Sequence, residues 1–422
     1  MSGVGPEHAP PESARLLRAV FGATFFIRFG FGLTVSIFAS YFAGRSSGIS
    51  GGSVGLIGFL SSLAPIGEFT TVLISGLAAD RYGRFPVLLS GTISAAALLG
   101  LMSLGHSAPF LGGVNLLFGV ASGAILAASL AVVADQSGRD ERGWEMGRFD
   151  AVNLLGYILG FAVGLGSLGL LADSELRSGL PWLFRLGAVV LLAGFLFALL
   201  SARGRTEPAH RNAFQLRNIR DAVLRREVLL LVLPWFVIYM LIGAAFIFLG
   251  DAAKGAGLPL TSLAALIGGG GLILLLTQPW FGRQADRRGR PLFLLLGTVG
   301  FVSLLILAGL IGQYGPRLYL LAGVGVSVLF ALGYGPAALA SLADVSHSIT
   351  RGTTMAVYSL VISLGMVVGL WLVSGLDAAY GFAGVDVFFA IIAIGLVTLT
   401  AVRLNDLRKR TTPEAGGVAP GL

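Results

Sequence analysis

The sequence predicts an all-α integral membrane protein whose twelve transmembrane helices form two pseudo-symmetric bundles of six. Three observations carry this prediction. Hydrophobic residues make up 55% of the 422 residues and charged residues only 12%, so the chain lacks the polar surface of a soluble fold. The apolar residues occur in long runs without the alternation of a barrel strand. A dense charged stretch, GLAADRYGR at 76–84, returns 206 residues later as GRQADRRGR at 282–290.

Apolar stretches long enough to cross a hydrocarbon core of about 30 Å divide the chain into two sets of six. The first set lies at 18–43, 53–79, 86–105, 109–134, 148–172 and 181–202. The second set lies at 228–252, 260–282, 291–312, 317–343, 353–376 and 383–403. We therefore expect a tail at 1–17, a bundle at 18–202, a linker at 203–227, a bundle at 228–404 and a tail at 405–422.

The distribution of basic residues orients these helices. With both termini in the cytoplasm, the inside segments carry 23 of the 29 Arg and Lys residues and the outside loops carry four. This is the positive-inside pattern. It excludes a nucleic-acid partner, because the basic charge lines one membrane face. In the linker, Leu216, Ile219 and Val223 recur at helical spacing, which fits either a helix on the membrane surface or a solvated connection.

The sequence lacks the residue patterns of several enzyme and cofactor classes. It contains no cysteine, which excludes disulfides and thiolate chemistry. Neither of its two Lys residues lies in a phosphate-binding loop, and no zinc motif or Ser-His-Asp set is present. We therefore expect neither an enzyme nor a cofactor, and any energy source is an ion gradient across the bilayer.

The repeated charged loop is accompanied by a second repeat. Both copies of the loop fall on the predicted cytoplasmic turn between the second and third helix of a set. The pattern D-x6-R-G-x-x-M follows the fourth helix of each set, so the two halves are structural duplicates. The residues predicted to form the gate are Gly76, Asp80, Arg81, Gly83, Arg84, Asp135, Arg142, Gly282, Asp286, Arg287, Gly289, Arg290, Asp344 and Arg351.

The charged loops have the form G-x-x-x-D-R-x-G-R, and in this feature residues 18–404 resemble the major facilitator superfamily. The resemblance implies that family's fold and secondary active transport by alternating access. Gly147, Gly156, Gly160 and Gly164 resemble a glycine pattern of its proton-coupled drug and metabolite exporters, with Phe161 in place of a Pro. Ordinary packing of small residues between helices is the alternative for these glycines.

The resemblance also implies a role for the loop carboxylates. Asp80 would meet the start of the eleventh helix near Gly352 and Thr353, with Arg142 nearby. Because charged hydrogen bonds contribute about 1.5–3 kcal/mol each, a few of them can bias an equilibrium between inward-open and outward-open states. The alternative is that the loop arginines only fix the topology. Independently of the family, Gly83 and Gly289 predict tight turns.

Two ionisable residues are predicted to lie deep in the membrane. Arg28 follows Arg18 by ten residues and Glu68 precedes Asp80 by twelve, which places both about 15–18 Å from the cytoplasmic side. We expect the two side chains to face each other or a shared cavity. They form either a permanent ion pair or a functional site, in which Glu68 binds a proton and Arg28 responds or binds an anion.

Further polar and aromatic residues in the predicted spans are candidates for the wall of a central cavity. They are Asn115, Tyr157, Tyr239, Tyr334, Tyr358 and Trp371. Each is also explained by ordinary packing. We assign these residues, with Arg28 and Glu68, to substrate or proton binding.

The sequence thus predicts a monomeric transporter in a prokaryotic cytoplasmic membrane that exports a small amphipathic or lipophilic compound in exchange for protons. The first alternative is an importer or facilitator of a small organic anion bound by Arg28. The second is a membrane sensor that transports nothing, which the repeated gate disfavours.

Overall fold

The computed structural model describes most of the chain. The described residues are 11–45, 54–105, 107–138, 141–170, 173–202, 228–229, 231–240, 242–243, 259–314, 317–346, 353–372, 393–398 and 401. They are almost entirely α-helical and include no strand. The predicted linker at 203–227, with its possible surface helix, lies outside them, as do both predicted tails apart from 11–17.

All six helices of the predicted first bundle are present. They are α1 (Pro11–Arg45), α2 (Val54–Tyr82), α3 (Arg84–Met102), α4 (Ala108–Gln136), α5 (Arg142–Leu170) and α6 (Asp173–Ala202). The second part contains α9 (Leu260–Arg288), α10 (Arg290–Tyr314), α11 (Leu318–Ala331) and α12 (Tyr334–Asp344). Residues 228–229, 231–240, 242–243, 353–372, 393–398 and 401 are also helical. Within the described residues, eight helices are long and apolar enough to cross a membrane.

Several predicted helix boundaries require correction. Helix α5 begins at Arg142, six residues before the predicted 148. Helix α6 begins at Asp173, but its apolar part, Leu180–Ser201, matches the predicted span 181–202. Hydropathy misses such ends because the polar residues outside the lipid can still be helical. The predicted span 317–343 consists of α11 and α12, with a turn at 332–333 between them.

The repeated loops form the tight turns that their glycines predict. Gly83 separates α2 from α3 with a φ of 98°, and Gly289 separates α9 from α10 with a φ of 93°. These are the positive-φ residues within the described part of the chain. Other side chains rarely adopt this conformation, because their Cβ atom clashes with the backbone. The two loops are therefore equivalent in structure as well as in sequence.

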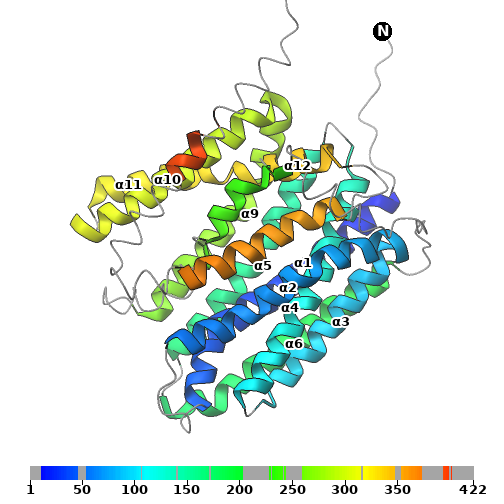
Figure 1. Cartoon of the computed structure of the whole chain (residues 1–422), viewed down its shortest axis with the longest axis vertical. Coiled ribbons are helices and arrows are strands. Elements are labelled where there is room, and N and C mark those ends of the chain that lie inside the picture. Colours follow the sequence, from blue (N-terminus) through cyan, green and yellow to red (C-terminus); the bar gives the residue numbers. More distant parts are fainter. Residues whose placement is uncertain are drawn as a thin grey trace, which may run out of the picture.

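The helices form two groups that meet along α5 (Figure 1). Helix α1 packs on α4, α5 and α6, whereas α5 also contacts α9 and α12 across the boundary. Glycine permits the closest of these approaches. A Cβ atom at Gly160 would lie 2.0 Å from the Phe29 carbonyl oxygen of α1, and one at Gly147 would lie 2.8 Å from that of Gln278 in α9. These two glycines therefore act in helix packing.

Candidate substrate site and gate

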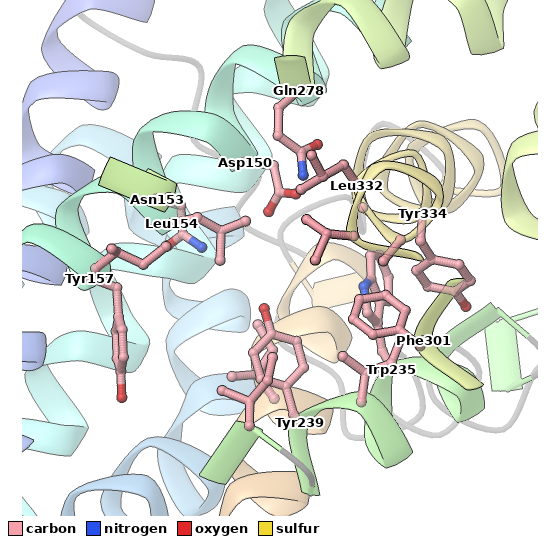
Figure 2. A pocket seen from close by; sticks show the side chains of 18 of the residues that line it. Asp150, Asn153, Leu154, Tyr157, Trp235, Tyr239, Gln278, Phe301, Leu332 and Tyr334 are labelled. Carbon is pink, nitrogen blue, oxygen red and sulfur yellow. The ribbon is translucent and has the colours of Figure 1, made fainter. Parts of the chain in front are cut away.

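A cavity of about 390 Å³ lies between the two groups of helices. Its first wall comes from α1 and α5, and the opposite wall comes from 235–242, α9–α12 and 358–366. Most lining residues are apolar. The polar and aromatic ones are Arg28, Asp150, Asn153, Tyr157, Trp235, Tyr239, Gln278, Phe301, Tyr334 and Tyr358. Figure 2 shows Asp150 and Gln278 projecting toward the cavity, with the Tyr239 hydroxyl opposite them.

The structure brings Arg28 and Glu68 together, as their predicted depths require. Their side chains form an ion pair with an N–O distance of 3.4 Å, and both are buried. Arg28 Nε also donates to Asn153 Oδ1 at 2.9 Å. Glu68 Oε1 accepts from the Ser359 hydroxyl at 2.5 Å, and Oε2 accepts from the Ser122 hydroxyl at 3.2 Å. A buried ion pair needs such additional hydrogen bonds to offset its desolvation.

The two members of this pair differ in their access to the cavity. Arg28 lines it, whereas Glu68 is not among its lining residues. Glu68 instead connects α2 to the 353–372 helix through Ser359. The pair therefore contributes no net charge to the cavity wall in this state.

Sequence reasoning missed Asp150. This residue is 3% exposed and lines the cavity, and its Oδ1 accepts a hydrogen bond from the Tyr358 hydroxyl at 3.2 Å. The predicted span begins at 148, and its third residue, Asp150, was not singled out. Because α5 begins at Arg142, Asp150 lies eight residues, or about 12 Å, into the helix. No local pattern marked it, because Asp150 follows Arg148 at the polar edge of the apolar run.

The remaining cavity candidates separate into two groups. Tyr157, Tyr239, Tyr334 and Tyr358 line the cavity, whereas Asn115 and Trp371 do not. Asn115 Nδ2 donates to the carbonyl of Leu60 between α4 and α2. Trp371 Nε1 donates to the Ser62 hydroxyl, and this bond joins the 353–372 helix to α2.

The carboxylate of the first charged loop binds the beginning of the 353–372 helix. Asp80 Oδ2 accepts from the backbone N–H and from the hydroxyl of Thr353, both at 3.0 Å. The predicted contact with Thr353 is therefore confirmed, while Gly352 lies outside the described residues. Because the N–H groups of a helix N-terminus lack partners within the helix, a carboxylate is a favourable acceptor for them.

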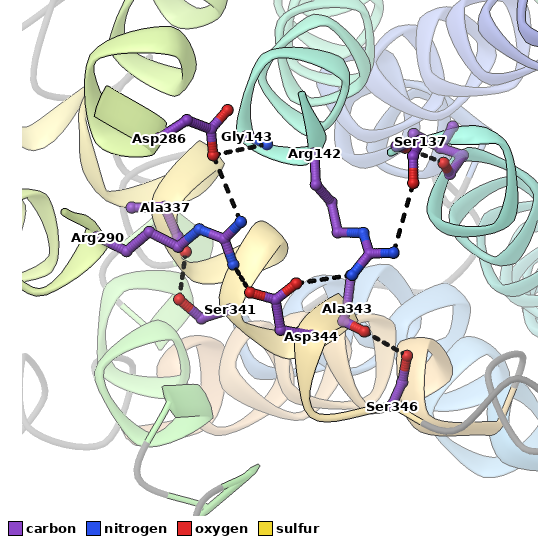
Figure 3. Close-up of polar contacts among 11 residues, drawn as sticks. Ser137, Arg142, Gly143, Asp286, Arg290, Ala337, Ser341, Ala343, Asp344 and Ser346 are labelled. Carbon is purple, nitrogen blue, oxygen red and sulfur yellow. Dashed lines mark hydrogen bonds and ion pairs between the residues drawn. The ribbon is translucent and has the colours of Figure 1, made fainter. Parts of the chain in front are cut away.

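The carboxylate of the second loop makes the corresponding contact from the second group of helices to the first. Asp286 Oδ1 accepts from the N–H group of Gly143 at 3.1 Å, at the start of α5 (Figure 3). Its Oδ2 accepts from the N–H group of Trp144, also at 3.1 Å. Partial burial raises the pKa of the Asp286 carboxyl, and Arg290 and these two N–H donors oppose that rise. Each group of helices thus holds a helix N-terminus of the other.

Two further aspartates join the arginines of these loops. Asp344 lies between Arg142, at 2.7 Å, and Arg290, with which it also forms an ion pair (Figure 3). Asp135 pairs with Arg84 at 2.9 Å. Arg142 is therefore bound to Asp344, and Arg351 lies outside the described residues.

The other loop residues make fewer described contacts. The Arg81 guanidinium lies over the Tyr82 ring at 5.3 Å, and Arg287 is exposed. Gly76 is buried, and a Cβ atom at Gly282 would lie 2.1 Å from the Gly143 carbonyl oxygen. Within the described residues, no cluster of three His, Cys, Asp or Glu side chains is suited to a metal ion.

Comparison with known proteins agrees with the family resemblance of the charged loops. The family model of the Major Facilitator Superfamily matches residues 20–332 and 236–420, which together cover most of the chain. The chain belongs to the major facilitator superfamily. It is therefore a multi-pass membrane transporter and not an enzyme, and alternating access is general to its family.

Curated relatives include two bacterial proteins named multidrug resistance protein MdtG. That of Escherichia coli K12 (strain DH10B) is 28% identical over 354 residues, which cover 80% of each chain. That of Citrobacter koseri is 29% identical over 347 residues, covering 79% of this chain and 80% of the relative.

Solved structures with the same fold include two transporters. The human organic anion transporter MFSD10 (TETRAN) has a TM-score of 0.73 and 18% identity, covering 93% of this chain and all of that one. The proton:xylose symporter XylE has a TM-score of 0.71 and 16% identity, covering 96% and 97%. At these identities the similarity establishes the fold alone.

Proposed function

We propose that this transporter exports a small amphipathic or lipophilic compound across a prokaryotic inner membrane in exchange for protons. The observation that carries this proposal is the central cavity. Its wall is mainly apolar and aromatic, with a few polar groups that include a buried carboxylate. Such a wall suits a ligand with a large apolar body. The name of the MdtG relatives, which refers to multidrug resistance, supports export.

A proton gradient can supply the energy for this export. One proton that moves down about 100 mV and one pH unit releases roughly 3.7 kcal/mol, which sustains a substrate gradient of a few hundred-fold. The loop carboxylates and arginines form the gate on one face, and this gate opens and reforms in each cycle. A monomer contains all of these parts, and no cofactor is required.

The alternative is an importer or facilitator of a small organic anion. It is favoured by the position of Arg28 in the cavity wall. Its weakness is that Glu68 already neutralises Arg28 at 3.4 Å. A sensor that transports nothing would have no use for carboxylate contacts on both sides of the boundary.

Transport by purified protein in liposomes tests these functions. With ethidium as probe, we expect accumulation against its gradient when a pH gradient is imposed, and none without it. If Glu68 carries the proton, Glu68→Gln removes the response to the pH gradient and retains ethidium binding. For the anion alternative, Arg28→Ala reduces binding of benzoate more than that of ethidium. A protein that moves neither probe under either condition contradicts the proposed exporter.

A further inference from the structure

The cavity contains one carboxylate that no described basic residue neutralises. Among the described residues, the ion pairs involve other acids, and none includes Asp150. Its Oδ1 accepts from Tyr358, and Oδ2 packs so closely on α12 that a Cβ atom at Gly335 would lie 2.1 Å away. A buried, unpaired carboxylate is costly, and binding a proton removes that cost.

The titratable groups around Asp150 come from four elements. Tyr358 of the 353–372 helix donates to it, and the Tyr239 hydroxyl lies 3.4 Å from that of Tyr358. Tyr334 of α12 also lines the cavity, but its hydroxyl donates to the backbone carbonyl of Leu231. From α1 comes Arg28, whose guanidinium is held by Glu68 and Asn153 as described above. Helix α9 contributes Gln278, which does not titrate.

The hydrogen bond between Asp150 and Tyr358 joins the same two helices whose N-termini bind the gate carboxylates. Asp150 is seven residues beyond Gly143 on α5, and Tyr358 is five residues beyond Thr353. A change at this bond therefore acts on both helices that hold the gate. A hydroxyl donates more strongly to an ionised carboxylate than to a neutral one.

We propose that Asp150 is the residue that binds and releases the coupling proton, with Tyr358 as the group that transmits its charge state to the gate. This inference rests on the proposed proton-coupled transport. In the proton step, the ionised carboxylate takes a proton from a hydronium ion that enters from one side, so that a carboxyl O–H bond forms, one hydronium O–H bond breaks and water is left. The carboxyl group returns that proton to water on the other side. Glu68, with its balancing Arg28, then acts as a permanent contact between helices.

Infrared difference spectra of the purified full-length protein test the assignment directly. A carboxyl group that binds a proton gives a C=O stretching band in acidic buffer that is absent in alkaline buffer. We expect this band in the wild type, its loss in Asp150→Asn and its retention in Glu68→Gln. Glu145→Gln, on the same helix but outside the cavity lining, is the matched control and retains the band. A band unchanged in Asp150→Asn overturns the proposal.

A second variant tests the assignment while the carboxyl group remains. Tyr358→Phe removes the hydroxyl that donates to Asp150, so we expect the C=O band to change frequency and to persist in more alkaline buffer. A band identical to that of the wild type in Tyr358→Phe contradicts the proposal, even if Asp150→Asn does not fold.

Transport in liposomes separates this proposal from the proposed function. We expect Asp150→Asn to reduce ethidium accumulation driven by a pH gradient to the level seen without a gradient. An Asp150→Asn variant that still accumulates ethidium in response to the gradient overturns the proposal. A wild-type protein that moves no ethidium counts against the exporter, whereas the infrared band still decides whether Asp150 binds the proton.

Discussion

Asp80 and Asp286 occupy equivalent positions in the two copies of the charged loop, but their surroundings differ. Both accept hydrogen bonds from the N-terminus of a helix in the other group. Asp80 has 1% of its side chain exposed and also accepts from the Thr353 hydroxyl, whereas Asp286 has 9% exposed and accepts only from backbone N–H groups at that helix. Duplication thus preserved the chemistry of the contact but not its degree of burial.

This difference predicts that the two carboxylate contacts of the proposed gate are unequal in strength. A charged hydrogen bond contributes more where water is excluded, because less screening opposes it. The Asp80 contact is therefore expected to hold the gate more strongly than the Asp286 contact. Four predictions follow from this ranking, and each is measured by the distance between pairs of spin labels. The chain has no cysteine of its own, so labelled cysteines can be introduced at Tyr82 and Arg288 without background.

The largest effect is expected for Asp80→Asn. This change removes the charge that accepts from Thr353 and should cost about 1.5–3 kcal/mol, which opens the gate roughly 10- to 150-fold more often. The distance between labels at Tyr82 and Arg288 should lengthen in a larger fraction of molecules. Glu141→Gln, at an exposed acid just before α5, is the control and should leave the distribution unchanged.

Asp286→Asn should open the same gate less. Its more exposed carboxylate should contribute about 1–2 kcal/mol, equivalent to roughly 5- to 30-fold in the population. The same pair of labels reports the change. A larger effect of Asp286→Asn than of Asp80→Asn would show that burial does not rank the two contacts.

Arg142→Gln should have a smaller effect, because its partner Asp344 has 28% of its side chain exposed and retains Arg290. We expect a cost below about 1 kcal/mol. Combining Arg142→Gln with Arg290→Gln should cost more than the sum of the single changes, since Asp344 then loses both of these arginines. Additive costs would indicate that the two arginines act independently.

The smallest effect is expected at the end of the cavity that lies away from the charged loops. It should favour opening at that end rather than at the gate. There Trp371 donates a single hydrogen bond to Ser62, and Phe161, Leu165 and Ala264 make apolar contacts. Trp371→Phe should remove one neutral hydrogen bond, at a cost of about 0.5 kcal/mol, and favour opening at that end. Labels at the exposed Leu170 and Leu318 should move apart, while the labels at the gate should not.

Much of the fold could be predicted because its signals are local. A membrane-spanning helix must satisfy its backbone within itself, so hydropathy reveals it without knowledge of its neighbours. The tight turns at Gly83 and Gly289 came from short motifs in the same way. The contact of Asp80 with Thr353 was implied instead by the resemblance to the major facilitator superfamily. The predicted start of α5 was wrong, because its first turns are polar. Helix α6 likewise extends beyond its predicted span by a polar segment that begins at Asp173.

The sequence alone thus determined the helical membrane fold, the duplication and the shared depth of Arg28 and Glu68. Only the tertiary structure decided which acid is neutralised and which lines the cavity. Glu68 obtains its partners from α1, α4 and the 353–372 helix, whereas the partner that the described residues supply to Asp150 is a tyrosine hydroxyl. The reason is that these partners lie far away in the chain. Their approach depends on how each helix is rotated and packed, which no local pattern records.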